Sequence, residues 1–164
     1  MVNSEVVVIG VDAAASRAAF VALRDTEFFT MAFTKFGSVG AVASAAGANA
    51  TAEFLDQLPW QITLPIQAYV EWPVLGRGGF RSTMVQAFTS GAIQGTLHER
   101  GCVTKGANVS SWKKAVVGKG NATKEEVVES LRLRWPSLHD TVVGDQDLCD
   151  AACVAIYGQS LQES

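Results

Sequence analysis

The sequence lacks the usual features of exported and membrane proteins. None of its apolar runs approaches the roughly 20 residues that a membrane-spanning helix needs, and the opening MVNSEVVVIG lacks the basic start of a secretory or transit peptide. The three cysteines, Cys102, Cys149 and Cys153, are odd in number and lack the spacing of a zinc site. We therefore expect reduced thiols and a non-secreted protein without membrane association, in the cytoplasm of a bacterial or phage-infected cell or in an organelle matrix.

Signals for covalent catalysis and for nucleotide hydrolysis are also missing. The chain shows no Ser-His-Asp or Cys-His arrangement that would supply a nucleophile. The segment GKGNATK contains glycines and lysines, but it lacks the G-x-x-x-x-G-K-[ST] spacing of a phosphate-binding P-loop. Chemistry that depends on a covalent nucleophile or on a bound nucleoside triphosphate is therefore not predicted.

Length and charge indicate one domain with a polarised surface. The 164 residues are 48% apolar and contain no internal repeat, so we expect a single domain over residues 1–164. Within a net charge of −3, the segment from Arg77 to Arg134 holds ten of the thirteen basic residues and four acidic ones, which makes it +6 and the remainder −9. This separation favours a phosphate-binding surface beside a cation site, although a solvated helix face would have the same composition.

The apolar patterns predict a mixed α/β fold. Runs of β-branched and aromatic residues predict three antiparallel strands, at residues 5–11 before Asp12, within AAASRAAFVALRD, and at 27–33. Residues 37–49 are almost entirely Gly, Ala, Ser and Val, which predicts a flexible or weakly helical connection before a short helix in ATAEFLDQL. Strands that alternate with helices should follow, and together they describe a mixed sheet flanked by helices.

The second half of the chain contains most of the expected helices. After a buried strand at 66–72, helical spacing through Met84, Phe88, Ala92 and Leu97 predicts a long helix at 80–100. A short strand near 102–103 or 108–109 and a helical turn in SSWKKAVV should come next. Asn121 or Thr123 should cap a further helix, whose apolar side consists of Val127, Val128, Leu131 and Leu133. A last helix is expected at about 147–159.

Four acidic residues lie where predicted elements begin or end. Asp12 follows the first strand, Glu71 closes an apolar strand, and Asp147 and Asp150 share a face of the last helix. Clustered carboxylates repel one another and hard oxygen ligands select Mg²⁺ or Mn²⁺, so their convergence would indicate a metal site for phosphodiester cleavage. Taken singly, Asp12 would equally begin a turn, and Asp145 or Asp147 would equally cap a helix.

Four segments occur in an informative order: VVVIGVDAAASR, AYVEWP, KKAVVGKGNATKEEV and DQDLCDAACVAIYG. In this order and at these intervals they resemble the RuvC family of Holliday junction resolvases, and departures from the family pattern suit a diverged phage or organellar member. The resemblance implies a ribonuclease H-like fold. It also implies a homodimeric endonuclease that binds branched DNA and cuts four-way junctions with paired symmetric nicks, using two Mg²⁺ ions per site, for which Mn²⁺ would substitute.

The resemblance also implies roles for individual residues. Carried over to this sequence, it makes Asp12, Glu71, Asp147 and Asp150 the ligands of the two ions, and places Lys113 and Lys124 near the scissile phosphate, with Lys124 among the catalytic residues. The expected DNA-binding residues are Lys113, Lys114, Lys119, Lys124, Arg77 and Arg81. A solvated basic face remains the alternative for the lysines.

The loop after Glu71 departs from the family pattern. Members resemble one another in an aromatic wedge three positions after this glutamate, where the present sequence has Val74. Trp72 or Phe80 would supply stacking instead, or would belong to the core, which we favour for Trp72. The helix at 80–100 is a candidate dimer interface, although its apolar side would equally be core.

Other functions remain open at this stage. A nuclease with broader specificity for branched DNA or replication forks is the first alternative, and a catalytically silent DNA-binding module of the same fold is the second. A sugar-kinase relative is remote, because the chain is too short for a second lobe.

Overall fold

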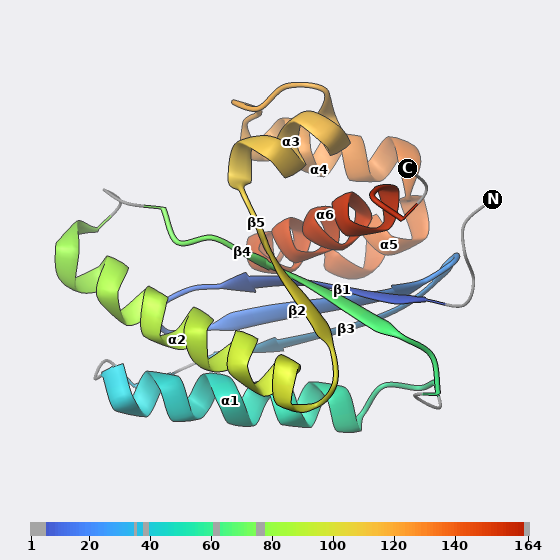
Figure 1. The fold of residues 1–164 in the computed structure, drawn as a ribbon. Coiled ribbons are helices and arrows are strands. Elements are labelled where there is room, and N and C mark those ends of the chain that lie inside the picture. The colour runs from blue at the N-terminus through green and yellow to red at the C-terminus, as the bar shows by residue number, and fades with distance from the viewer. Residues whose placement is uncertain (1–5, 35, 38–39, 61–62, 75–77, 163–164) are drawn as a thin grey trace.

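A five-stranded mixed sheet forms the centre of the molecule. The computed structural model describes residues 6–34, 36–37, 40–60, 63–74 and 78–162. The strands are β1 (Val7–Ala13), β2 (Ala18–Arg24), β3 (Glu27–Phe33), β4 (Ile66–Glu71) and β5 (Val103–Ala107), and their order in the sheet is β3-β2-β1-β4-β5 (Figure 1). The first three strands are antiparallel, whereas β4 and β5 run parallel to β1. The expected mixed sheet is therefore confirmed.

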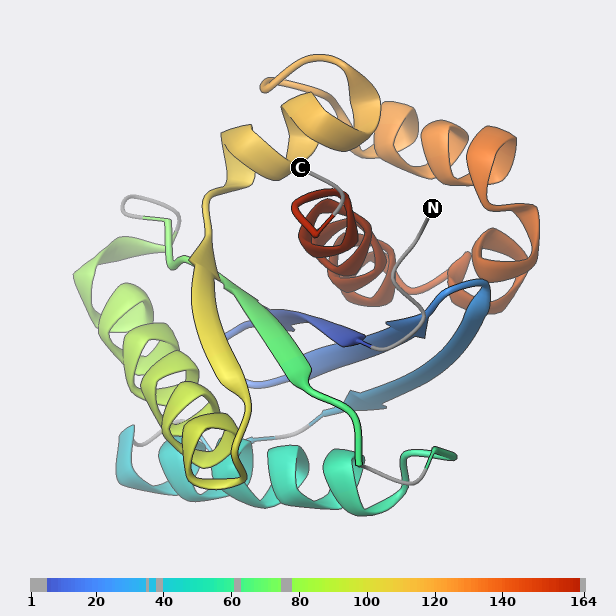
Figure 2. The same cartoon turned by 45° about the vertical axis from the view of Figure 1, so that its right-hand side comes forward.

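Helices cover both faces of this sheet. They are α1 (Gly40–Asp56), α2 (Gly79–Glu99), α3 (Val109–Val117), α4 (Lys124–Arg134), α5 (Pro136–Val142) and α6 (Gln146–Ser160). Figure 2 shows α1 and α2 beneath the sheet and α6 above it, with α3, α4 and α5 arranged around α6. Within the described residues, none of these helices combines the length and apolarity needed to cross a membrane.

The sheet separates two apolar cores. On the side of α1 and α2, Phe54 is fully buried and stacks on Phe20 with ring centroids 4.9 Å apart. On the side of α6, the buried side chains include Tyr69, Trp112 and Leu131. Strand β1 contributes to both cores because its side chains alternate between the two faces.

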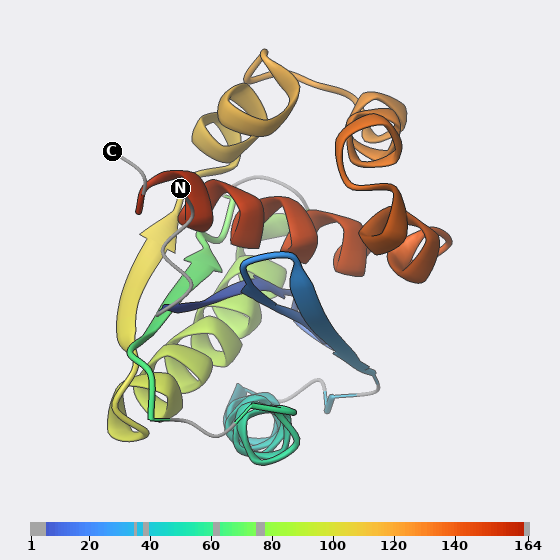
Figure 3. The same cartoon turned by 90° about the vertical axis from the view of Figure 1, so that its right-hand side faces the viewer.

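Helix α6 packs against β1 at backbone distance (Figure 3). A Cβ atom at Gly10 would lie 2.2 Å from the carbonyl oxygen of Ala151 and 2.3 Å from the amide nitrogen of Ala155. Only glycine leaves room for this approach. The small residues Ala151 and Ala155, which the sequence places on the packing side of this helix, are fully buried. As a result, the first turns of α6 lie close to the carboxyl end of β1.

The segment 37–49 corrects one prediction. Its described residues from Gly40 onward belong to α1, a helix of 17 residues. Of the two expectations for this connection, the helical one is therefore confirmed and the flexible one is wrong, and the expected short helix is only the second half of a longer one. The physical reason is tertiary. The Cβ position of Gly47 lies 3.2 Å from the Thr89 side chain of α2, so small residues let the two helices pack closely.

Helix α2 has the expected bounds but a different buried face. The residues that it buries are Thr89, Ser90, Ile93 and Leu97. Met84 and Phe88, which we expected to share the apolar stripe with Leu97, are exposed to 42% and 52%. The apolar residues of this helix therefore lie on two different faces, one against the core and one against solvent.

The region around α4 agrees with most of what the sequence predicts for it. Thr123 begins α4 with a capping box, in which its hydroxyl accepts from the amide of Glu126 and the Glu126 carboxylate accepts from the amide of Thr123. The short helix α5, which begins at Pro136, was not expected. Leu133 was placed on the apolar side of α4, but 66% of it is exposed, which corrects that prediction.

Candidate active site

Three of the four predicted acids come from adjacent elements at one end of the sheet. Asp12 lies in β1, and Glu71 ends the parallel neighbour β4, one position beyond the paired residues Val11 and Val70. Parallel strands bring their carboxyl ends to the same edge, so these two acids are neighbours across the sheet. Asp150 lies in the second turn of α6, which crosses β1 at Gly10.

Burial and mutual repulsion raise the pKa of these three carboxyls. Asp12 is only 9% exposed, and burial raises its pKa well above the ordinary value, with further increases from the charges of Glu71, Asp150 and Asp147. Burial, followed by the charge of Asp150, raises the pKa of Glu71 to about 7. The pKa of Asp150 is also raised, chiefly by burial. The ionised forms of these three carboxyls are therefore disfavoured as long as no cation is bound near them.

Neutral donors support two of these carboxylates. The indole Nε1 of Trp112 donates to Oε2 of Glu71 at 2.9 Å, and the amide of Gln146 donates to Oδ1 of Asp150 at 2.9 Å. Both hydrogen bonds favour the charged form and so limit the rise in pKa. Within the part of the chain that the structure describes, no hydrogen bond or ion pair to the Asp12 carboxylate is found.

Asp147 is engaged differently from the other three acids. It forms an ion pair with Arg17 from the connection between β1 and β2. Arg17 also donates from Nη2 to both carboxylate oxygens of Asp145, at 3.0 Å each. Asp145 in turn caps α6, because its Oδ1 accepts from the amides of Asp147 and Leu148. The alternative role of Asp145 as a helix cap is thus confirmed.

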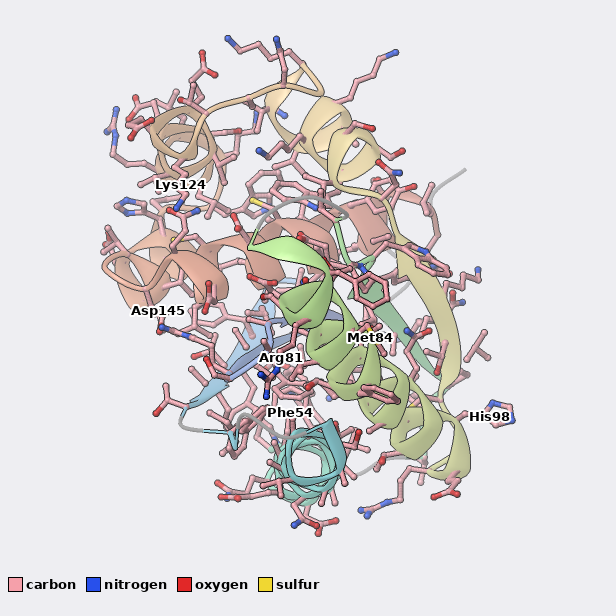
Figure 4. The ribbon with its side chains drawn as sticks, turned by 90° about the vertical axis from the view of Figure 1, so that its left-hand side faces the viewer. Phe54, Arg81, Met84, His98, Lys124 and Asp145 are labelled. Carbon is pink, nitrogen blue, oxygen red and sulfur yellow. The ribbon has the colours of Figure 1, made fainter. Side chains whose placement is uncertain are left out.

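A cleft of about 740 Å³ adjoins the acidic residues. Glu71 and Asp150 line it together with Lys113 and Lys124, and both lysines lower the pKa of Asp150 against the larger effect of burial. The Nζ of Lys113 donates to the carbonyl of Ala122 at 2.8 Å, which fixes its position in the cleft. In Figure 4, Lys124 at the start of α4 lies above Asp145, the residue that caps α6.

The other predicted DNA-binding residues lie farther from the acids. Lys114 is exposed on α3, and Lys119 forms an ion pair with Glu126 outside the cleft. Arg81 lines a separate hollow with Ala15 and Ser16, and Figure 4 shows it on the N-terminal half of α2. Arg77 lies outside the described residues. The structure therefore brings Lys113 and Lys124, but not the other basic residues, into the cleft with the acids.

The structure corrects the expectation for Trp72 and adds two residues that were not expected. Trp72 is 59% exposed and lines the cleft, so its assignment to the core is wrong, and Phe80 is 78% exposed. The contact of Trp112 with Glu71 joins residues 41 positions apart, and no local pattern indicates it. Arg17 offered a weak signal, because it is the basic residue within the motif that contains Asp12.

The donor set fits a hard divalent cation, although the side chains do not enclose one as they stand. Carboxylate oxygens are the preferred ligands of Mg²⁺ and Mn²⁺, and a bound cation would offset the mutual repulsion that contributes to the raised pKa values. Among the described residues, no group of three or more His, Cys, Asp or Glu side chains is close enough together to hold an ion.

Comparison with known proteins gives the fold a name. No protein-family model and no curated protein sequence matches the chain. A solved structure of RuvC from Thermus thermophilus matches 96% of this chain and 96% of that chain, with 17% sequence identity and a TM-score of 0.64. T. thermophilus RuvC in complex with Holliday junction substrate matches over 97% of this chain and 96% of that chain, with 14% identity and a TM-score of 0.67. The chain therefore has the RuvC-like form of the ribonuclease H-like fold.

Proposed function

We propose that this protein is a metal-dependent endonuclease that cuts four-way DNA junctions. The observation that carries the proposal is the meeting of Asp12, Glu71 and Asp150 beside a cleft that contains Lys113 and Lys124. An acidic site next to two lysines suits a reaction on a phosphodiester, because carboxylates bind the metal ions and the positively charged lysines bind the phosphate. The likeness to T. thermophilus RuvC in complex with Holliday junction substrate supports a branched DNA as the substrate.

In this proposal the four carboxylates of Asp12, Glu71, Asp147 and Asp150 hold two divalent ions, Mg²⁺ or Mn²⁺. When bound, such ions lower the pKa of an attacking water and stabilise the leaving oxygen. The protein's own groups have supporting tasks. Trp112 orients Glu71 through its hydrogen bond, and Lys113 and Lys124 bind the phosphate in the cleft and stabilise its developing charge.

A second copy of the chain would bind to the outer face of α2. This face presents Phe80, Met84 and Phe88 at intervals of four residues, all of them exposed, and continues with Gly91 and Gly95, where a Cβ would meet no atom within 4 Å. Figure 4 looks onto this face and labels Met84. Large exposed apolar side chains next to small residues favour a close helix contact between protomers. Two sites related by a two-fold axis would then nick two strands symmetrically.

The test uses a labelled immobile four-way junction and a linear duplex of matched length, each incubated with Mg²⁺ or with a chelator and resolved on a denaturing gel. We expect paired symmetric nicks only with the junction and only with metal. Asp12→Asn should bind the junction as the wild type does but cut it at least about 100-fold more slowly, because the buried ligand loses its charge. Wild-type cutting rates in Asp12→Asn would refute the carboxylate mechanism.

A broader branched-DNA nuclease is the second candidate. The observation that favours it is the exposed aliphatic Val74 in the loop that follows Glu71, since an aliphatic side chain cannot stack on a base pair as an aromatic wedge would. Parallel assays with forks, flaps and junctions separate the two functions. Equal cutting of all branched substrates would support the broader nuclease, whereas binding without cutting would support a catalytically silent module.

A further inference from the structure

Arg17 connects the turn after β1 to the beginning of α6 through two carboxylates. One edge of its guanidinium is paired with Asp147, and its Nη2 donates to both oxygens of Asp145 at 3.0 Å. Asp145 is at the same time the N-cap of α6. Because a planar guanidinium presents several donors in fixed directions, one arginine satisfies both acids, which a lysine ammonium would do less well.

The four proposed metal ligands therefore differ in how their charge is balanced. Within the described residues, Arg17 is the one basic side chain in an ion pair with any of them, and its partner is Asp147. The other three carboxyls repel one another, Asp12 from a buried position and Glu71 and Asp150 from half-buried ones. The same arginine also acts on Asp12, whose raised pKa it partly lowers. The protein thus supplies its own cation at the place where a divalent ion would bind.

We propose that Arg17 is a positioning residue that sets the affinity of this site for divalent cations. Arg17 pairs with Asp147 while no metal ion is bound. A metal ion that binds the Asp147 carboxylate must displace the Arg17 guanidinium from it. Throughout the exchange Arg17 keeps its second partner, Asp145, so the turn after β1 stays attached to α6 and Asp147 remains on its own helix turn. The inference rests on the proposed function, because it takes Asp147 to be a metal ligand.

The experiment is a calorimetric titration of Mn²⁺ into the metal-free protein, without DNA. We expect Arg17→Gln to lower the Kd for Mn²⁺ roughly tenfold, which is the size expected when one positive charge no longer repels a divalent cation across several Å of water-like medium. Arg17→Lys keeps the charge and should stay within about threefold of the wild type. The matched control is Arg100→Gln, which removes a similarly exposed arginine from its ion pair with Asp56 on another part of the surface.

A second readout separates this role from simple structural support. In chelator, Arg17→Gln should unfold at a lower temperature than the wild type, and Mn²⁺ should raise its Tm by more than it raises that of the wild type. Lower stability with unchanged or weaker Mn²⁺ binding would overturn the inference and leave Arg17 as a structural bridge. If the wild type itself bound no Mn²⁺, the metal site would be refuted and this inference with it. The two failures are therefore distinguishable.

Discussion

Glu71 shows how the site balances opposing influences on one side chain. Its half-buried position at the end of β4 removes part of it from water and places it near Asp150, and both effects favour the protonated form. The hydrogen bond from Trp112 and the charge of Lys113 favour the ionised form. The first pair of effects is larger, so the pKa of Glu71 rises to about 7.

This imbalance predicts how the stability of the metal-free protein depends on pH. The folded protein binds the Glu71 proton more tightly than the unfolded chain, so the free energy of unfolding should fall as the pH rises from about 4.5 to about 7. The decrease from this residue is at most about 3.5 kcal/mol, for about 2.5 pKa units at about 1.4 kcal/mol per unit. Glu71→Gln should flatten this slope, as measured by urea unfolding in chelator. A variant with the slope of the wild type would contradict the prediction.

Trp72 is placed to stack on a nucleobase. A Cβ at Gly106 would lie 1.8 Å from its Nε1, so the indole lies directly against the backbone of β5, and much of it remains exposed beside the cleft. We predict that Trp72→Ala weakens junction binding by about 5-fold to 100-fold, the range for loss of one base–aromatic stack, whereas Trp72→Phe retains most of the affinity. Fluorescence anisotropy in chelator measures this. Leu133→Ala, which removes an exposed apolar side chain elsewhere, is the control, and equal affinities of the two alanine variants would refute the stacking role.

Among the elements, α6 has the strongest effect on the geometry of the site. It contributes Asp147 and Asp150, it is capped by Asp145, and it lies near Asp12 because it contacts β1 at Gly10. A helix held farther from the sheet would carry its acids away from those of β1 and β4. The close contact at Gly10 is therefore a condition for the site as well as for the core.

We predict that Gly10→Ala lowers the free energy of unfolding by about 1–3 kcal/mol, because the new methyl group would overlap backbone atoms that no rotamer change can move. Gly47→Ala is the graded control. Its Cβ would lie 3.2 Å from the nearest atom, a side-chain methyl of Thr89, and alanine favours the helix more than glycine does, so the loss should be smaller. Chemical denaturation compares the two variants. A smaller loss for Gly10→Ala than for Gly47→Ala would contradict the close-packing argument.

For the whole molecule, the outer face of α2 predicts the oligomeric state. Phe88→Glu places a charge in the proposed contact and should convert a dimer to a monomer in sedimentation experiments. Leu133→Glu, which changes an exposed leucine on α4, should remain dimeric. A monomeric wild type, or a dimer that tolerates Phe88→Glu, would place the two-fold contact elsewhere.

The sequence was a good guide to elements whose signals are local. The bounds of β3 and α2, the cap at Thr123 and the packing side of α6 all follow from the order of apolar, polar and capping residues, and the structure confirms them. The length of α1 did not follow, because its small residues have a weak local preference and become helical through contact with α2. Local preference decides an element only where packing does not override it.

For the candidate site, too, some residues could be predicted from the sequence and others only from the tertiary structure. The sequence by itself determined which acids and lysines to consider, because Asp12, Glu71, Asp150, Lys113 and Lys124 lie in the four segments that resemble a known family. Only the tertiary structure decided that Trp112 supports Glu71, that Arg17 holds Asp147, and that Trp72 lies at the surface. These contacts depend on how β1, β4, β5 and α6 are arranged in space. A pattern of neighbours along the chain contains no such distances, because they arise only when the sheet forms and α6 packs on Gly10.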